Sequence, residues 1–459
     1  MSDTMTEHQK KFIRWGLLLL VSFVIAANYY AYDAMSSIKS VLQTELGISS
    51  TDYGLIVSFY GFPNTFLLMT VFGGIFLDRF GIRKTGFFFT LFCALGVLLT
   101  AYGASDFFRG GGIGYSLFNS FLPQYSPELK MMMLGRLLYG LGAETSIVAI
   151  NKILVKWFKG KELSFAFSIN LAIARLGTAA ALIFSPILIE TNTGWTLALW
   201  VAALLMGMGL MFFIVYMAYD KKYTSAEREG SLLNADEKFN MGDIFGLLKN
   251  KSFILISLLC VTFYSAVFPF QAYCPDFLHN KFAVSLKMSG MLSSLIIWGT
   301  IVFTPIFGYF VDKKGKRATL MFYGSGMLLI AHLVLSLTSL TPYIAMFIIG
   351  IGFSLVPAAM WPGVARIVEE KRLGTAYGIM TSIQNLGLFV FPILAGAITD
   401  AVNKDITPEM LKQGATLDYT YTILMFAGLG LLGFLYAFFL KRDDAKKPNH
   451  PLEMPEMGD

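Results

Sequence analysis

The stretch GIFLDRFGIRK at residues 74–84 recurs in altered form as GYFVDKKGKR at residues 308–317. In both copies a glycine is followed by an aspartate four residues later, then by a base, a second glycine and an arginine. These positions, each 234 residues apart, are Gly74, Asp78, Arg79, Gly81 and Arg83 in the first copy and Gly308, Asp312, Lys313, Gly315 and Arg317 in the second. One copy is a modest signal, but two at matching positions indicate an internal duplication. We therefore expect two halves of like orientation, with these ten residues serving as gating turns.

Composition places the chain in a membrane. Of its 459 residues 55% are hydrophobic and only 14% charged, with a mean hydropathy of +0.61, which excludes a soluble fold. The three cysteines are scattered, so neither a disulfide framework nor a metal centre is indicated, and we expect no cofactor. The expected partners are a small substrate and the lipid bilayer; a nucleic acid is not expected, and we expect a monomer.

A membrane-spanning helix needs about 20 mainly apolar residues. Twelve such stretches are present, at approximately 14–45, 51–77, 84–104, 130–157, 162–190, 194–219, 250–278, 285–311, 317–339, 342–367, 373–400 and 419–440. The fold class we predict is an all-α integral membrane protein with two six-helix bundles. The N-terminal apolar run lacks a small-residue cleavage site, so it is interpreted as an uncleaved first helix.

Basic residues give the orientation. The N-terminal segment, the even-to-odd turns and the C-terminal tail hold 27 of the 36 lysines and arginines, which predicts that both termini are cytoplasmic. The long polar connection after the sixth helix divides the chain. We predict an N-terminal bundle over 1–219, a cytoplasmic linker over 220–249, a C-terminal bundle over 250–441 and a cytoplasmic tail over 442–459. The outer insert at 105–128 either caps the outer mouth or is a plain extracellular loop.

Two predicted helices carry charges near their centres. Glu144 lies in 130–157 and Arg175 in 162–190, each at a similar distance from the short turn between them, so an antiparallel pair places them at one depth. A charge at the bilayer centre costs roughly 2.5–3.5 kcal/mol on insertion scales. A structural ion pair is one explanation. It leaves Arg136, which shares a helix face with Gly140 and Glu144, without a role, so a site for a charged ligand is favoured.

The duplicated turn resembles the signature of the major facilitator superfamily, and the resemblance covers the chain from Arg14 to Lys441. Within the superfamily the chain resembles the family of the lysosomal dipeptide transporter, major facilitator superfamily domain-containing protein one. The local matches are Tyr32-Asp33, Gly135-Arg136, Gly142-Ala143-Glu144-Thr145, Trp157-Phe158-Lys159-Gly160-Lys161-Glu162-Leu163, Ala174-Arg175, Phe268-Pro269-Phe270, Trp361-Pro362, Leu373-Gly374-Thr375-Ala376-Tyr377-Gly378 and Ser382-Ile383-Gln384-Asn385-Leu386-Gly387.

The resemblance implies transport by alternating access, with Glu144 holding the ammonium of a short peptide and Arg175 its carboxylate. Other residues expected to bind substrate or wall the cavity are Arg136, Tyr29, Tyr32, Tyr264, Trp298, Trp361, Gln384 and Asn385. The chain departs from the lysosomal members in its longer outer insert, in its lack of a dileucine sorting signal and in having no glycosylation sequon in an outer loop. It therefore looks like a bacterial relative in the inner membrane; a lysosomal membrane is expected only for a eukaryotic source.

Two other functions remain open. A proton-coupled carrier of an organic anion would hold its substrate with Arg136 and Arg175, and Asp33 or Glu144 would titrate. An integral membrane enzyme is disfavoured because the sequence contains no zinc-protease, nucleophile-elbow or phosphate-loop motif. We therefore expect that the protein is not an enzyme.

Overall fold

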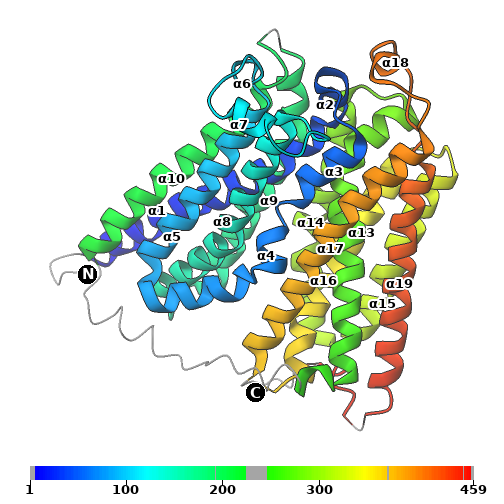
Figure 1. Ribbon diagram of the computed structural model, residues 1–459. Helices are drawn as coiled ribbons and strands as arrows, with labels where there is room; N and C mark the ends of the chain where they lie inside the picture. The colour runs from blue at the N-terminus through cyan, green and yellow to red at the C-terminus, as the bar shows by residue number, and fades with distance from the viewer. Residues whose placement is uncertain (1–5, 192, 224–245, 370–371, 448, 456–459) are drawn as a thin grey trace. The chain divides into compact units, whose positions relative to one another are not determined.

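The computed structural model describes residues 6–191, 193–223, 246–369, 372–447 and 449–455. Every regular element within these ranges is a helix (Figure 1). Eleven helices in this part of the chain are long and apolar enough to cross a membrane. The predicted all-α, multi-pass class is confirmed.

Contacts divide the chain into two compact units. Unit 1 comprises residues 1–38 and 59–236, and unit 2 comprises residues 39–58 and 237–459. Residues 39–58 precede the predicted boundary at residue 219, yet they pack on helices that follow the linker. The linker predicted at 220–249 lies mostly outside the described residues.

Unit 1 is built on two sets of packed helices: α5 lies along α8, and α1 packs against both α9 and α10. Ser126 begins α8, since its hydroxyl accepts a hydrogen bond from the backbone N–H of Leu129. The elements of this unit are α1 (Glu7–Asp33), η1 (Ala34–Ser37), α4 (Phe62–Phe66), α5 (Met69–Gly103), α6 (Asp106–Arg109), α7 (Tyr115–Asn119), α8 (Pro127–Phe158), α9 (Leu163–Ile189) and α10 (Leu197–Tyr223).

In unit 2, α15 packs against α16 and α19, α14 against α16, and α3 against α17. Side-chain caps again begin two of the long helices, Asn250 at α13 and Ser285 at α14. Its elements are α2 (Lys39–Leu46), α3 (Ser50–Ser58), α13 (Lys251–Phe282), α14 (Leu286–Lys314), α15 (Arg317–Leu337), α16 (Pro342–Ile367), α17 (Leu373–Val402), α18 (Pro408–Lys412) and α19 (Thr420–Asp444).

The second predicted helix, 51–77, is wrong as a continuous helix. It is divided into α3, α4 and the beginning of α5. Pro63 lies in the first turn of α4, where its ring forbids a helical bond from its nitrogen and disfavours helical backbone at the preceding residue. Leu68, with φ of 50°, separates α4 from α5. The first predicted helix, 14–45, also ends early, at Asp33, and continues as η1 and α2.

The duplicated turn has the same backbone feature in both copies. Gly81 interrupts α5 with φ of 78°, and Gly315 ends α14 with φ of 68°. Such left-handed values favour glycine because it has no side chain to clash with the backbone. The first glycine of each copy, Gly74 or Gly308, has a different environment. A Cβ added at Gly74 or Gly308 would meet no atom of a neighbouring described residue within 4 Å, so neither position is a close helix contact among these residues.

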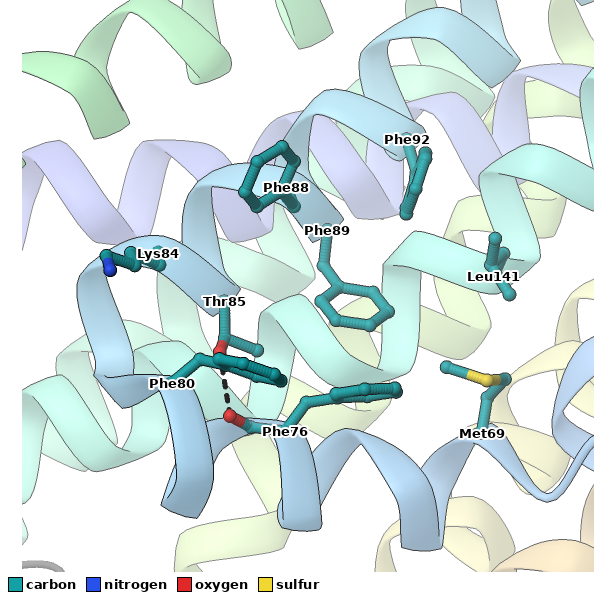
Figure 2. A pocket seen from close by; sticks show the side chains of 9 residues that line it. All are labelled: Met69, Phe76, Phe80, Lys84, Thr85, Phe88, Phe89, Phe92 and Leu141. Atoms are coloured by element: carbon teal, nitrogen blue, oxygen red, sulfur yellow. Dashed lines mark hydrogen bonds between the residues drawn. The ribbon is translucent and has the colours of Figure 1, made fainter.

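The interruption at Gly81 leaves a hollow of about 460 Å³ between the two arms of α5 and α8 (Figure 2). Thr85 holds the turn by donating a hydrogen bond to the carbonyl of Phe76, 3.0 Å away. Apart from Lys84 and Thr85, the hollow is lined by apolar side chains: Met69, Phe76, Phe80, Phe88, Phe89, Phe92 and Leu141. A lining that is mostly aromatic and aliphatic suits hydrocarbon better than a polar solute.

Candidate functional site

The three predicted interior charges of unit 1 lie on two neighbouring helices. Arg136 and Glu144 belong to α8, and Arg175 belongs to α9, which follows it after a four-residue turn. Arg136 is buried, whereas Glu144 and Arg175 are half-buried. These charges therefore lie within one unit, on helices that pack against each other.

Arg136 lies among three tyrosine rings. Its guanidinium carbon is 5.3 Å from the ring centre of Tyr32, 5.7 Å from that of Tyr60 and 5.2 Å from that of Tyr139. The negative faces of the rings attract the cation. Two guanidinium nitrogens, Nε and Nη2, nevertheless have no hydrogen-bond partner among the described residues. A buried donor without an acceptor is costly, so this site has unused capacity to bind an anionic or carbonyl oxygen.

Glu144 is linked to the same cluster through Tyr60. The Tyr60 hydroxyl donates a hydrogen bond to Glu144 Oε1 at 3.0 Å. A close approach at Gly140 makes this possible, since a Cβ there would lie 2.0 Å from the carbonyl oxygen of Tyr60. No ion pair involves the Glu144 carboxylate in the part of the chain that the structure describes. Its charge is thus available to a cation from outside the protein.

Arg175 has an aromatic neighbour of its own: its guanidinium carbon lies 5.9 Å from the ring centre of Tyr29 on α1. Tyr29 also lines a cavity of about 330 Å³ between α1, α8 and α9. Asp33, the proposed proton site, is buried at the end of α1. Unit 1 thus brings together Tyr29, Tyr32 and the three charged residues on the three helices α1, α8 and α9.

Unit 2 brings together only part of the predicted set. The Trp361 Nε1 donates to the Tyr264 hydroxyl at 2.9 Å, and the Tyr377 hydroxyl donates to the Trp361 carbonyl at 3.1 Å. Trp298 is 41% exposed on α14 and takes no part in these contacts. Gln384 is half-buried, whereas Asn385 is fully buried and donates to the Thr381 carbonyl of its own helix at 3.0 Å.

The two signature arginines have different partners. Arg83 donates to Asp220 at the end of α10, with Nε 2.9 Å from Oδ2. Arg317 is buried and donates instead to the Met454 carbonyl of the C-terminal segment, at 3.0 Å. Asp312, Lys313 and Arg79 are exposed, and the side chain of Asp78 lies outside what the structure describes. The proposed gating role of these residues remains a prediction.

Sequence reasoning missed several residues of the site. Tyr139 is three residues from Arg136, a spacing that places both on one helix face, so this partner was open to prediction. Tyr60 lies in the broken stretch before α4, and its approach to α8 has no sequence signal. Asn151, Ser168 and Asn170, which line the cavity, were not selected because isolated polar residues in a long helix carry no pattern.

Known proteins share this architecture. The model of the Major Facilitator Superfamily matches residues 18–365 and 272–456. The Lysosomal dipeptide transporter MFSD1 of Mus musculus is 33% identical over 398 residues, which cover 84% of this chain and 80% of the relative. The Homo sapiens protein is 32% identical over 395 residues, with the same coverage. A more distant relative, the Probable galactarate/D-glucarate transporter GarP of Escherichia coli (strain K12), is 24% identical and covers 87% of this chain and 92% of its own length.

Solved structures agree on the fold. The nucleoside transporter NupG aligns with a TM-score of 0.66 at 16% identity, over 92% of this chain and 98% of its own. A variant of the peptide transporter POT in complex with sulfate aligns with a TM-score of 0.63 at 15% identity, over 93% of this chain and 95% of its own. On the strength of the family match and of relatives above 30% identity, the chain belongs to the Major Facilitator Superfamily and is a multi-pass membrane protein with the fold of a secondary transporter.

Proposed function

We propose that the protein carries short peptides, dipeptides above all, across the membrane by alternating access. Glu144 binds the substrate ammonium and Arg175 binds its carboxylate. The observation that carries the proposal is that Glu144 and Arg175 lie on the packed helices α8 and α9, while the described residues provide no ion-pair partner for Glu144. The MFSD1 relatives, named as lysosomal dipeptide transporters, support the same substrate class.

The chemistry of a dipeptide fits an acid and a base at fixed separation. A free dipeptide is a zwitterion, so one anchor at each end selects for length, and neither anchor itself contacts the side chains. Hydrogen bonds to charged groups contribute about 1.5–3 kcal/mol each in protein environments. Each anchor should therefore account for roughly a 10- to 150-fold change in affinity.

A second function is favoured by one observation. Arg136 has two guanidinium nitrogens without partners, and with Arg175 it could hold the two ends of a dicarboxylate. The relative GarP is named as a probable carrier of galactarate and D-glucarate, which are dicarboxylates. In this alternative Asp33 or Glu144 would take up a coupling proton.

Binding and uptake of blocked peptides separate these functions. Purified protein in liposomes is tested with Ala-Ala, N-acetyl-Ala-Ala, Ala-Ala-amide and galactarate. Wild type should favour Ala-Ala over both blocked peptides. Glu144→Gln should no longer favour Ala-Ala over N-acetyl-Ala-Ala, and Arg175→Ala should no longer favour Ala-Ala over Ala-Ala-amide. Each variant already lacks the contact that the blocked ligand has lost.

Three results would contradict the proposal. Uptake of galactarate without uptake of Ala-Ala would favour the organic-anion carrier. Recovery of transport in the double variant Glu144→Gln/Arg175→Ala, with both single variants unstable, would show that the two residues only neutralise each other. Equal responses of free and blocked peptides in every variant would remove both anchors from the mechanism.

A further inference from the structure

We propose that the cavity between α1, α8 and α9 is the subsite for the side chain of the substrate's carboxyl-terminal residue, and that it selects neutral side chains. The inference rests on the proposed function, since it takes Arg175 as the anchor of the carboxylate. It goes beyond that function by assigning a pocket and a preference to one position of the peptide.

The position of the cavity carries the first step. Tyr29 lines it and also lies beneath the Arg175 guanidinium, and Ala174, another lining residue, directly precedes Arg175. Leu171 and Ser168 continue the lining along α9 for two turns, about 10 Å at 1.5 Å per residue. The α8 lining residues Ile147 and Asn151 follow Glu144 by three and seven residues, so the α8 wall lies on the face of the ammonium anchor, while Tyr29 and Ala174 place the other wall at Arg175. A peptide whose carboxylate binds Arg175 therefore has this cavity beside its last residue.

The size of the cavity fits one side chain. Its volume is about 330 Å³, near the lower end of the roughly 300–1,000 Å³ of whole ligand pockets. One water needs about 10–15 Å³ of such space, so the cavity is far larger than a single water site and accepts an aromatic side chain.

The lining sets the preference. Among the described residues the lining contains no charged side chain. Its polar members are Tyr29, Asn151, Ser168 and Asn170, and its apolar members are Ile25, Ile147, Phe167, Leu171 and Ala174. The Oδ1 of Asn170 accepts a hydrogen bond from the Ser22 hydroxyl at 2.9 Å, which fixes the amide and leaves its nitrogen as a donor. Neutral side chains, apolar or hydrogen-bonding, suit such walls. Because the two ends of the peptide already take up the charges of Arg175 and Glu144, a charged side chain would lose its hydration without gaining a counter-charge from the lining.

A lipid-facing origin of the cavity is inconsistent with these residues. The Ser168 hydroxyl donates to the Ser164 carbonyl at 2.9 Å and Asn170 accepts from Ser22, but the amide of Asn151 facing hydrocarbon would be left unsatisfied. Polar residues within spanning segments mostly face a cavity or the bundle interior. Ser168 and Asn170 come from one turn of α9, and Asn151 comes from α8. Polar groups from two helices therefore line the cavity, as in a pocket that holds water or a ligand.

The test compares peptides that place one side chain at either end. Binding of Ala-Ala, Ala-Phe and Phe-Ala is measured on wild type and on Ser168→Phe, which fills the cavity from an exposed position. We expect Ser168→Phe to weaken the binding of Ala-Phe at least about tenfold and to change the binding of Ala-Ala and Phe-Ala less than about twofold. Ser164→Phe, one turn away on α9 and outside the cavity, is the matched control and should leave all three unchanged.

A second variant tests the preference by gain of binding. Asn151→Asp introduces a counter-charge into the cavity. The ratio of the affinity for Ala-Lys to that for Lys-Ala should therefore rise about tenfold relative to wild type. Equal effects on Ala-Phe and Phe-Ala, together with equal effects on Ala-Lys and Lys-Ala, would overturn the subsite while wild-type binding of Ala-Ala still supports the proposed function. If wild type binds none of the dipeptides, the proposed function fails and the subsite fails with it.

Discussion

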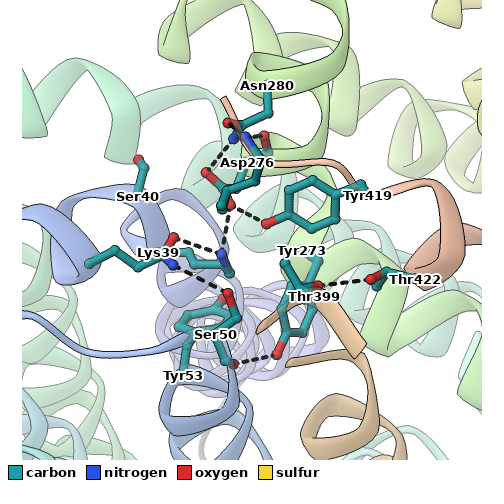
Figure 3. A network of polar contacts seen from close by, with 12 residues as sticks. Lys39, Ser40, Ser50, Tyr53, Tyr273, Asp276, Asn280, Thr399, Tyr419 and Thr422 are labelled. Carbon is teal, nitrogen blue, oxygen red and sulfur yellow. Dashed lines mark hydrogen bonds and ion pairs between the residues drawn. The ribbon is translucent and has the colours of Figure 1, made fainter. Parts of the chain in front are cut away.

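Lys39 and Asp276 form a buried ion pair in unit 2, with Lys39 Nζ 2.8 Å from Asp276 Oδ2 (Figure 3). Their side chains are 0% and 3% exposed. Lys39 begins α2 and Asp276 lies near the end of α13, so the pair ties the short α2–α3 segment to a long helix.

Neighbouring polar groups complete the coordination of both charges. Lys39 Nζ also donates to Gln43 Oε1 at 2.8 Å, and Asp276 accepts hydrogen bonds from the Tyr419 hydroxyl and from Asn280. The carboxylate of Asp276 has no proton to give, so the Tyr419 hydroxyl is the donor in their hydrogen bond.

Breaking this pair should destabilise the protein. Removing one partner of a buried pair leaves the other charge uncompensated, which costs about 3–5 kcal/mol. We expect Lys39→Met and Asp276→Leu each to lower the melting temperature strongly in detergent, and the double variant to recover part of the loss. Lys404→Met, at an exposed position, is the control. If Lys39→Met melts at the same temperature as wild type, the pair contributes no stability.

This pair also shows where sequence reasoning stops. Its members are 237 residues apart, and no spacing rule joins a lysine at a helix start to an aspartate in another predicted helix. The long helices were predictable within a few residues because an uninterrupted apolar run of membrane length has few other structures open to it. The break in 51–77 was missed because hydropathy does not register Pro63.

In the candidate site, too, some residues are visible in the sequence and others are not. Arg136, Glu144 and Arg175 stand out in the sequence because interior charges are costly. Tyr60 does not, since it reaches Glu144 only through the close approach at Gly140. Tertiary packing, not periodicity, decides such contacts.

Tyr60 is expected to position the Glu144 carboxylate. Tyr60→Phe removes one hydrogen bond of about 1 kcal/mol, so binding of Ala-Ala should weaken about fivefold. N-acetyl-Ala-Ala, which has no ammonium, should be affected much less. The measurement is a binding titration of both ligands. A similar loss for both would assign Tyr60 a general structural role instead.

The C-terminal segment is expected to stabilise unit 2. Leu452 is fully buried, its backbone N–H donates to Asp444 Oδ1 at 3.0 Å, and its carbonyl accepts from the Arg317 N–H at 2.7 Å. Leu452→Ala should therefore cost about 2–5 kcal/mol, the range for truncating a buried leucine. Met454→Ala, at a half-exposed side chain, is the control. Unchanged melting of Leu452→Ala would mean that this segment does not hold its place in the membrane-bound protein.

Arg136 decides between the two proposed substrates. In the dipeptide carrier it borders the site through Tyr60 but anchors neither end of the peptide, so Arg136→Met should leave the preference for Ala-Ala over Ala-Ala-amide within about twofold of wild type. The organic-anion carrier needs its guanidinium, and galactarate binding should then be lost.

The melting temperature of Arg136→Met is an independent test of the role of this residue. Arg136 is 2% exposed, and two of its guanidinium nitrogens have no partner among the described residues. Replacing it with an apolar side chain of similar length therefore removes a desolvation cost. Arg136→Met should accordingly melt no lower than wild type, and Arg442→Met, at an exposed position, shows the effect of charge alone. A large loss of stability would show that the tyrosine rings around Arg136 already compensate its charge, in which case the unused donors are not a site for substrate.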